Sequence, residues 1–300
     1  MKKITSLELG FNSYPRKIFD NLDVSESTRV DYNYRIGLFL TFIKYNHFVS
    51  NSFLDFKRYL SKRNDYAVST KNKYLITAKV FLKELNRLGF LPINITQNVK
   101  LFQQNRKHKR IGLSESEVLL LSEKIKQLPI TMKNTRLRAI LCCLVLQGLR
   151  QKEIIGLAVR DLDLVNQTIS ITGKGREDKE MVDLHPETVK ALSEYLVTNK
   201  IADGPLFVSQ SNHKRNNRLT TRGLRGIVKA MLKELNINKC VHGFRHYFAT
   251  KLIKTYKGDL LAVAQYTRHK SIDTLQIYND SIKHKEDLPR FYRAFQGIQF

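Results

Sequence analysis

The sequence lacks a long apolar run and is poor in cysteine. Its longest purely apolar stretch is AILCCLVL, residues 139–146, well short of the roughly 20 residues that cross a bilayer. Three cysteines, two of them adjacent, offer neither a disulfide framework nor the spacing of a metal site. No apolar segment follows the N-terminal lysines, so no signal peptide is predicted. We therefore expect a cytoplasmic protein with reduced cysteines and no association with membranes.

Acidic residues are scarce relative to basic ones. The chain has 52 Lys and Arg against 27 Asp and Glu, a net charge of +25. A basic surface can serve solubility alone, but a surplus this large indicates a polyanionic partner, because neutralised phosphates release condensed counterions. Residues 1–111 contain 21 basic and 8 acidic residues, and the remainder contains 31 and 19. Because both parts are basic, we expect two lobes that face nucleic acid. An anionic membrane fits less well, since no basic amphipathic helix with an aromatic edge stands out.

The first hundred residues have the periodicity of helices. Residues 25–45 begin with capping residues and then place apolar side chains at helical intervals. A short helix is predicted around residues 52–63, and a longer one from Ser69 to Gly89. The apolar face of this longer helix comprises Leu75, Ala78, Leu82 and Leu85. We interpret residues 1–100 as a small all-helical domain.

The periodicity breaks and then changes after residue 100. Residues 101–112 are polar and basic and are interpreted as a linker. Ser114 and Glu117 have the spacing of a capping box, which predicts a new helix. Short β-branched runs on either side of Gly173–Gly175 predict a small antiparallel sheet, and helices resume after His185. The chain is thus predicted to be mainly α-helical with a small antiparallel β-sheet.

Four stretches of the second part contain residues that could carry chemistry. Each has an ordinary structural explanation when taken alone: a helix cap, a turn lysine, or a buried histidine. The stretches are LQGLRQKEIIGL with Arg150 and Glu153, TGKGRE with Lys174, HGFRHYFATKL with His242 and Arg245, and TRHKSIDTLQIYND with His269 and Tyr278.

Together these residue types suit one reaction. Two arginines match the two non-bridging oxygens of a phosphodiester, because guanidinium forks fit phosphate and keep their charge. A tyrosine, with a pKa of about 10, is a poor nucleophile unless the developing charge is stabilised and an acceptor for its proton lies nearby. A lysine on a hairpin could protonate the leaving oxygen. No step of this chemistry requires a metal or another cofactor, and no ligand cluster is visible in the sequence.

In order and spacing, these positions resemble the active-site set of the tyrosine recombinase (phage integrase) family. The resemblance covers nearly the whole chain, and it is closest to the simple two-domain, Xer-like or resolvase-like members. It implies an all-α core-binding domain within residues 1–100 and a mixed α+β catalytic domain over residues 113–285. The implied partner is double-stranded DNA with short inverted core sites, and the implied location is the nucleoid.

The resemblance also implies a role for each position. Tyr278 would attack the scissile phosphate and form a 3′-phosphotyrosine with a free 5′-hydroxyl. Arg150 and Arg245 would hold the phosphate, and Lys174 would protonate the leaving oxygen. Ligation would be the reverse attack by a hydroxyl from another strand, so that two sites exchange strands through a Holliday junction. The DNA would thereby be integrated, excised or resolved.

Three further positions follow from the same resemblance. His242 would accept the tyrosine proton, His269 would hydrogen-bond the phosphate, and Glu153 would orient Arg150. The family usually has Leu-Gly before the second histidine, whereas this chain has Thr267 and Arg268. A side chain in place of glycine at a helix end is expected to shift the local backbone, and Arg268 could contact the DNA backbone.

Other basic side chains are candidates for DNA contacts, although a solvated helix face would have the same pattern. They lie on the helix from Ser69 to Gly89, in the linker, and in the region from residue 215 to 233. The candidates are Lys71, Lys79, Lys83, Arg106, Lys107, Arg222, Arg225 and Arg268.

The C-terminal residues 286–300 predict a separate helix. Acidic residues and a proline are suited to its start, and Leu288, Phe291, Tyr292, Phe295 and Ile298 form an apolar stripe. This stripe could cover the protein's own core. By analogy with the family, it would instead dock on a neighbouring protomer in a homotetramer on two DNA sites, with copies of this chain or a paired recombinase.

Two other functions use many of the same features. A type IB topoisomerase-like or telomere-resolving enzyme would share the covalent chemistry, and a basic DNA-binding protein without catalysis would share the charge. The complete set of polar residues argues against the binder. The small helical domain and the apolar tail favour recombination between two sites over the topoisomerase.

Overall fold

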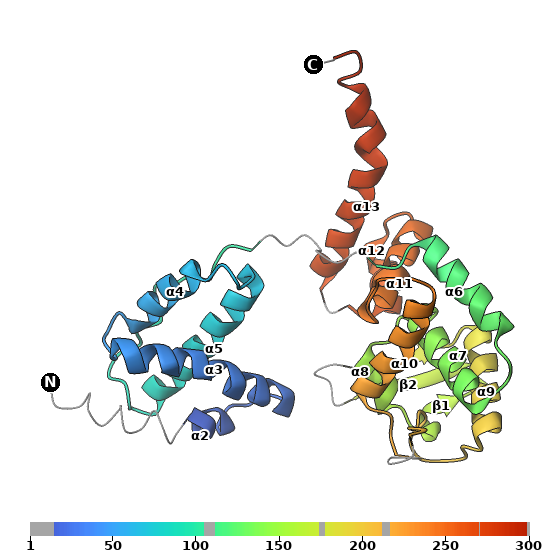
Figure 1. Ribbon diagram of the computed structural model, residues 1–300, viewed down its shortest axis with the longest axis horizontal. Helices are drawn as coiled ribbons and strands as arrows, with labels where there is room; N and C mark the ends of the chain where they lie inside the picture. The colour runs from blue at the N-terminus through green and yellow to red at the C-terminus, as the bar shows by residue number, and fades with distance from the viewer. Residues whose placement is uncertain (1–14, 105–111, 174–177, 212–216, 270, 299–300) are drawn as a thin grey trace. The chain divides into compact units, whose positions relative to one another are not determined.

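The computed structural model describes residues 15–104, 112–173, 178–211, 217–269 and 271–298, which form two compact units (Figure 1). Contacts within the chain divide it into Met1–Arg106 and Lys107–Phe300. The predicted site residue Lys174 and the predicted DNA contacts Arg106 and Lys107 lie outside the described residues. The fold is mainly α-helical with one small antiparallel sheet, as predicted.

The first unit consists of helices around an aromatic core. Its elements are α2 (Pro15–Asp20), α3 (Glu26–Asn46), α4 (Ser52–Lys62) and α5 (Val68–Arg87). Five phenylalanines are almost fully buried between these helices, namely Phe19, Phe39, Phe53, Phe56 and Phe81. Edge-to-face and tilted ring pairs fill the space between α3 and α4, where the ring centroids of Phe39 and Phe56 lie 4.9 Å apart. The three predicted helices of this region are confirmed.

The helix α5 buries the face that its sequence predicts. Leu75, Ala78, Leu82 and Leu85 are all at most 5% exposed, which is the expected result of a 3.6-residue repeat against a core. Asn72 on the same helix hydrogen-bonds both backbone groups of Phe102, at 3.0 and 2.9 Å. This pair of bonds holds the chain that leaves the unit against α5.

The second unit packs helices around a three-stranded sheet. The elements are α6 (Glu115–Gln127), α7 (Met132–Val145), α8 (Gln151–Gly156), the 3₁₀ turn η1 (Val159–Asp161), β1 (Leu162–Asp163), β2 (Thr168–Thr172), β3 (Lys179–Asp183), α9 (Pro186–Asn199), α10 (Thr221–Glu234), α11 (His242–Thr255), α12 (Leu260–Thr267) and α13 (Ile272–Arg293). No helix within the described residues is both long and apolar enough to cross a membrane.

The start of this unit follows from its capping residues. Ser114 Oγ accepts the backbone N–H of Glu117 at 3.1 Å, and the Glu117 carboxylate accepts the backbone N–H of Ser114 at 2.7 Å. Two unpaired donors of the first turn are therefore satisfied, and the predicted capping box of α6 is confirmed.

The sheet is antiparallel in the order β1–β2–β3. Thr168 pairs with Asp183 and Thr172 with Lys179. Ile169 and Ile171 point into the core and are at most 1% exposed, while their neighbours on β2 are partly in solvent. The predicted sheet is confirmed, and the segment joining β2 to β3 includes residues outside the described ranges.

The C-terminal helix differs from the prediction. Residues 286–293 do not begin a new helix but continue α13, which starts at Ile272 and contains both Tyr278 and Pro289. No glycine lies between these two residues to end the first part. Figure 1 shows the second half of α13 extending away from the other helices of its unit. Phe291 and Tyr292 near the end of α13, and Phe295 and Ile298 just beyond it, are 55–63% exposed.

We predict that Gly148→Ala destabilises the protein by about 2 kcal/mol or more. Gly148 has a φ of 57°, and a Cβ added to it would lie 2.2 Å from Cδ1 of Phe248. The matched control is Gly226→Ala in α10, where, apart from the backbone of its own helix, no atom of the described residues lies within 4 Å of the added Cβ, and alanine favours the helix. Urea unfolding of both variants measures the difference. Equal stability of the two variants would contradict the prediction.

Candidate active site

The first predicted arginine caps a short helix. Arg150 is the N-cap of α8, and its backbone N–H donates a 2.7 Å hydrogen bond to Oε2 of Glu153. Its Nη1 donates to Oε1 of the same carboxylate at 2.6 Å. The turn between α7 and α8 lies just before Arg150, and Gly148 makes it possible by adopting a left-handed backbone conformation. The Arg150 side chain remains 30% exposed, so its guanidinium group can still reach a ligand outside the protein.

Glu153 is the buried anion that organises this region. Its side chain is only 2% exposed. Burial acts to raise the pKa of the Glu153 carboxyl, but the backbone N–H of Arg150 and the charges of Arg268 and Arg150 together hold that pKa below its usual range. Glu153 is therefore ionised at neutral pH, and it orients Arg150 by two hydrogen bonds.

The second predicted arginine is held in the interior by backbone carbonyls. Arg245 on α11 is 3% exposed. Its Nη1 donates to the carbonyl of Gly148 at 2.7 Å, and its Nη2 donates to the carbonyl of Thr267. Burial, together with the charges of Arg150 and Arg268, lowers the pKa of Arg245 to about 9. The group remains a cation at neutral pH, and its orientation is fixed by three different segments of the chain.

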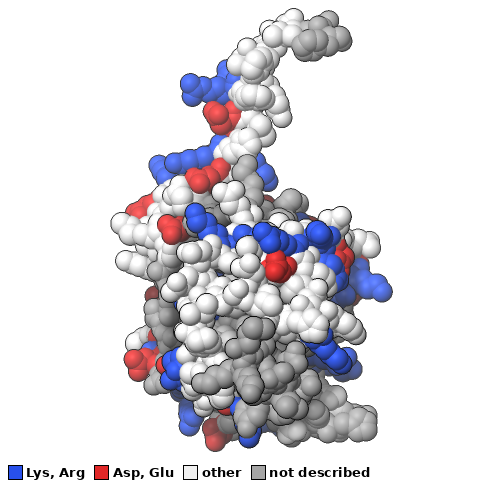
Figure 2. Space-filling view, turned by 90° about the vertical axis from the view of Figure 1, so that its left-hand side faces the viewer, with Lys and Arg blue, Asp and Glu red and all other residues white. Residues whose placement is uncertain are grey.

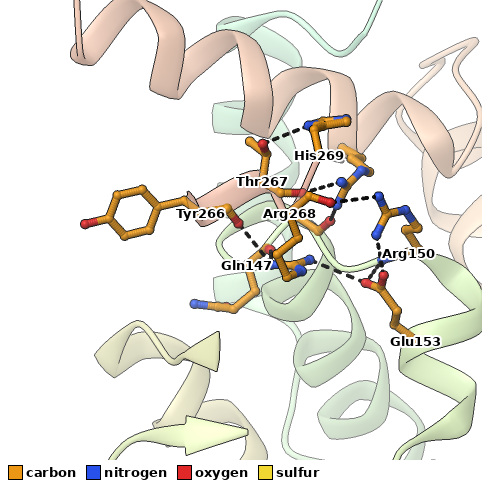
Figure 3. Close-up of polar contacts among 9 residues, drawn as sticks. Gln147, Arg150, Glu153, Tyr266, Thr267, Arg268 and His269 are labelled. Carbon is orange, nitrogen blue, oxygen red and sulfur yellow. Dashed lines mark hydrogen bonds and ion pairs between the residues drawn. The ribbon is translucent and has the colours of Figure 1, made fainter. Parts of the chain in front are cut away.

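Arg268 corrects a prediction. We expected it to contact the DNA backbone, but its side chain is 4% exposed and turns into the protein. Nη1 donates to the carbonyls of Gln147 at 3.4 Å and Tyr266 at 3.0 Å, and Nη2 lies 3.4 Å from Oε2 of Glu153. Figure 3 shows the Arg268 guanidinium group between Gln147 and Glu153, whereas the ring of Tyr266 points away from the cluster. The buried Glu153 carboxylate attracts Arg268 inward.

His269 lies at the edge of the same cluster. Its Nδ1 is 2.7 Å from Oγ1 of Thr267, which fixes the orientation of the ring. Burial and the charges of Arg245, Arg150 and Arg268 lower the pKa of His269 to about 3. The imidazole is thus neutral at neutral pH, and it can donate one hydrogen bond to a phosphate oxygen without adding a charge.

Tyr278 comes from a different element, α13, and is largely covered. It is 7% exposed and packs in a small apolar cluster with Ala249, Ile253, Val263 and Leu275. Burial raises the pKa of the Tyr278 phenol to about 12, against the opposing effect of the Arg245 charge. The tyrosine is therefore near the cationic cluster, but in this state it is a protonated and sheltered hydroxyl.

A third histidine, His246, which was not predicted from the sequence, lies between His242 and Tyr278. The ring of His246 is 4.7 Å from that of His242 and 5.1 Å from that of Tyr278, measured between centroids. His246 is buried, whereas His242 begins α11 and is exposed. Residues four apart on a helix share a face, so the spacing of the two histidines in the sequence could have identified this row.

Most of the basic residues predicted to contact DNA have side chains at least partly in solvent: Lys71, Lys79, Lys83, Arg222 and Arg225. Arg225 donates a 2.7 Å hydrogen bond to the side chain of Gln151, the first residue of α8. This contact links α10 to the helix that Arg150 caps.

The structure thus brings Arg150, Arg245, His269 and Glu153 into one cluster, with Tyr278 and two histidines beside it. Such a cluster can bind an oxyanion through fixed guanidinium groups and deliver a tyrosine hydroxyl to it. Within the described ranges, no group of three or more His, Cys, Asp or Glu residues could hold a metal ion.

Comparisons of the sequence with a family model and with individual proteins agree with one another. The model of the phage integrase family matches residues 113–285. The chain is 27% identical over 281 residues to tyrosine recombinase XerC of Roseiflexus sp. (strain RS-1), covering 89% of this chain and 87% of that protein. It is also 27% identical over 298 residues to tyrosine recombinase XerC of Rickettsia rickettsii (strain Sheila Smith), covering 94% and 95%.

Solved structures share the fold. A crystal structure of XerH site-specific recombinase bound to palindromic difH substrate matches with a TM-score of 0.72 at 21% identity, covering 88% of this chain and 79% of that chain. A lambda integrase (75-356) dimer bound to a COC' core site matches with a TM-score of 0.67 at 13% identity, covering 90% and 94%. At these identities the likeness establishes the architecture.

We predict that His269 makes the stability of the protein depend on pH. The pKa of His269 is about 3 in the folded protein and 6.5 ordinarily, so the unfolded chain binds a proton that the folded protein does not. The contribution of neutral His269 to the free energy of unfolding is therefore fully present above about pH 6.5, and it is lost as the pH falls towards 3. Urea unfolding at several pH values should show wild type losing stability relative to His269→Gln over this window. A constant difference between the two proteins would contradict the prediction.

Proposed function

The chain belongs to the phage integrase family, and we propose that it is a site-specific DNA recombinase whose nucleophile is Tyr278. The observation that carries this proposal is the convergence of two fixed guanidinium groups, Arg150 and Arg245, beside the α13 helix that bears the tyrosine. The relatives named above are tyrosine recombinases, which supports the same reaction here.

Arg150 and Arg245 bind the scissile phosphate. Glu153 orients the first and the carbonyls of Gly148 and Thr267 orient the second, so little reorganisation is needed when the phosphate enters. Fixed donors of this kind stabilise the extra negative charge of a phosphorane transition state. The neutral His269 adds a hydrogen bond to the same phosphate.

The reaction exchanges one phosphodiester for another. The Tyr278 oxygen attacks phosphorus, the bond to the 5′-oxygen breaks, and a 3′-phosphotyrosine forms. The phenol proton passes to the row of His242 and His246, and Lys174, which lies in the sequence between β2 and β3, protonates the leaving 5′-oxygen. Attack by a 5′-hydroxyl from a second duplex reverses these steps, regenerates the tyrosine, and produces a Holliday junction.

Double-stranded DNA is the polyanion that the positive charge of the protein would bind. The chain carries a net charge of +25, and Lys and Arg predominate over Asp and Glu on the face drawn in Figure 2. Phosphate contacts of these residues would make binding strongly dependent on salt. The bound duplex is a short site with inverted arms, each arm held by one protomer.

The end of α13 supports assembly into a tetramer on two such sites. Four exposed apolar residues, from Phe291 to Ile298, lie beyond the body of the unit. Figure 2 shows mostly uncharged side chains toward the described end of this helix. An apolar helix end of this kind becomes buried when it docks on a neighbouring protomer. The same helix carries Tyr278, so docking and positioning of the nucleophile are mechanically linked.

Substitution of the nucleophile tests the reaction. The DNA site is first recovered by selecting random duplexes that bind Tyr278→Phe, and a nick near the cleavage point then traps the covalent product. We expect wild type to form a protein–DNA adduct that resists denaturation, and Tyr278→Phe to form none while still binding the duplex, because only the hydroxyl is lost. The matched control is Tyr266→Phe, whose ring is 47% exposed and points away from the cluster. An adduct with Tyr278→Phe would refute the assignment, and relaxation of plasmid without a site would favour a topoisomerase.

Truncation tests the tetramer. We expect deletion of residues 286–300 to leave binding to one site unchanged but to abolish the pairing of two sites and recombination, because the exposed apolar end is removed. Electrophoretic mobility shifts separate the two binding states. The double substitution Arg290→Ser and Arg293→Ser, which retains the apolar residues of this segment, serves as the control and should still pair sites. Undiminished recombination by the truncated protein would contradict the proposed assembly.

A further inference from the structure

We propose that Arg268 is a positioning residue for the reaction: it shares the buried Glu153 carboxylate with Arg150 and so maintains a surplus of positive charge at the phosphate site. This inference rests on the proposed function. It concerns the residue that ends α12, directly before His269 in the chain.

The backbone of Arg268 is suited to glycine. It ends α12 in the left-handed conformation, with φ 55° and ψ 43°, and its N–H donates to the carbonyl of Ala264. A non-glycine residue in this conformation is strained, because its Cβ lies close to the following carbonyl oxygen. The end of α12 is regular, because Arg268 adopts the conformation that glycine commonly takes there. Arg268 thus occupies a backbone position that glycine would adopt with less strain.

Burial of the side chain adds a second cost. Its side chain is 4% exposed, its Nε has no hydrogen-bond partner among the described residues, and burial lowers the pKa of Arg268 against the opposing effect of Glu153. A charge removed from water is stabilised only by close partners. Those partners are the Glu153 carboxylate and two carbonyls, all within 3.4 Å. If position 268 served packing alone, an uncharged side chain would fill it without the cost of burying a charge.

Both the side chain and the backbone carbonyl of Arg268 help to position Arg150. Its Nη2 approaches Oε2 of Glu153, the same oxygen that accepts the backbone N–H of Arg150. Its own carbonyl accepts a hydrogen bond from Nη2 of Arg150 at 3.4 Å. The Arg150 guanidinium group is thus held by Glu153 on one side and by the Arg268 backbone on the other. This arrangement limits the directions in which Arg150 can turn.

The charge balance of the cluster shows what the side chain contributes. Arg150, Arg245 and Arg268 supply three positive charges, and Glu153 supplies one negative charge. Without Arg268 the surplus would fall from two to one, and Glu153 would be countered by Arg150 alone. Because these groups are largely shielded from water, the lost charge weakens attraction for a phosphate and for the dianionic transition state more than a surface charge would.

The test compares three variants in the covalent trapping reaction. Arg268→Met removes the charge at similar length, Arg268→Lys keeps it, and Arg268→Gly provides a residue that suits the backbone. We expect Arg268→Met and Arg268→Gly to slow formation of the adduct by about 10- to 100-fold, with binding of the duplex little changed. Arg268→Lys should recover most of the rate. The matched control is Arg136→Met, which removes another buried arginine whose contact is the carbonyl of Val208.

A second substrate distinguishes an electrostatic role of Arg268 from a role in packing alone. A duplex with an uncharged methylphosphonate at the scissile position presents less negative charge to the cluster, so the ratio of wild-type to Arg268→Met rates should fall towards one. Equal slowing on both substrates, or no rescue by lysine, would show that Arg268 only supports the fold. Unchanged rates in all variants would also overturn the inference. If wild type itself forms no adduct, the proposed function fails, and that outcome is distinct from the others.

Discussion

The site depends on one buried carboxylate. Glu153 is almost completely removed from water, and such an anion is stable only if cations and N–H groups surround it. It therefore draws together the N-cap of α8 and the C-terminal end of α12, which are more than a hundred residues apart in the chain. Arg245 then joins the turn after α7 to the same end of α12 through two carbonyls. These contacts fix the guanidinium groups, which in the proposed reaction bind the phosphate.

The proposed nucleophile, Tyr278, is held by apolar contacts rather than by charges. Tyr278 belongs to a small apolar cluster at one side of the unit, and its burial keeps the hydroxyl protonated. Its helix continues for fifteen residues beyond the tyrosine and ends in exposed aromatic side chains. In the proposed assembly, docking of the exposed end of α13 would act on the same helix that carries the hydroxyl. In our account, the protein separates a preformed phosphate site from a nucleophile that must be brought to it.

Local features of the sequence predicted much of this. The capping box of Ser114, the apolar face of α5 and the strand pair around Gly173 each depend on residues close together in the chain, and all three were predicted correctly. The prediction that Arg268 contacts DNA was wrong. An arginine beside a helix end is usually on the surface, and the sequence does not reveal that the buried Glu153 lies next to it in the fold. His246 was missed because it resembles a core histidine. The continuity of α13 through Pro289 was also missed, since the same residues could have begun a helix.

The central claim is that Tyr278 becomes covalently joined to DNA beside the arginine cluster. Mass spectrometry of the trapped adduct, after digestion with nuclease and trypsin, tests it most directly. Our account predicts a nucleotide attached through its 3′-phosphate to the tryptic peptide of residues 271–283, with fragmentation that assigns it to Tyr278. A nucleotide on any other of the 13 tyrosines, or a 5′-phosphate linkage, would contradict it.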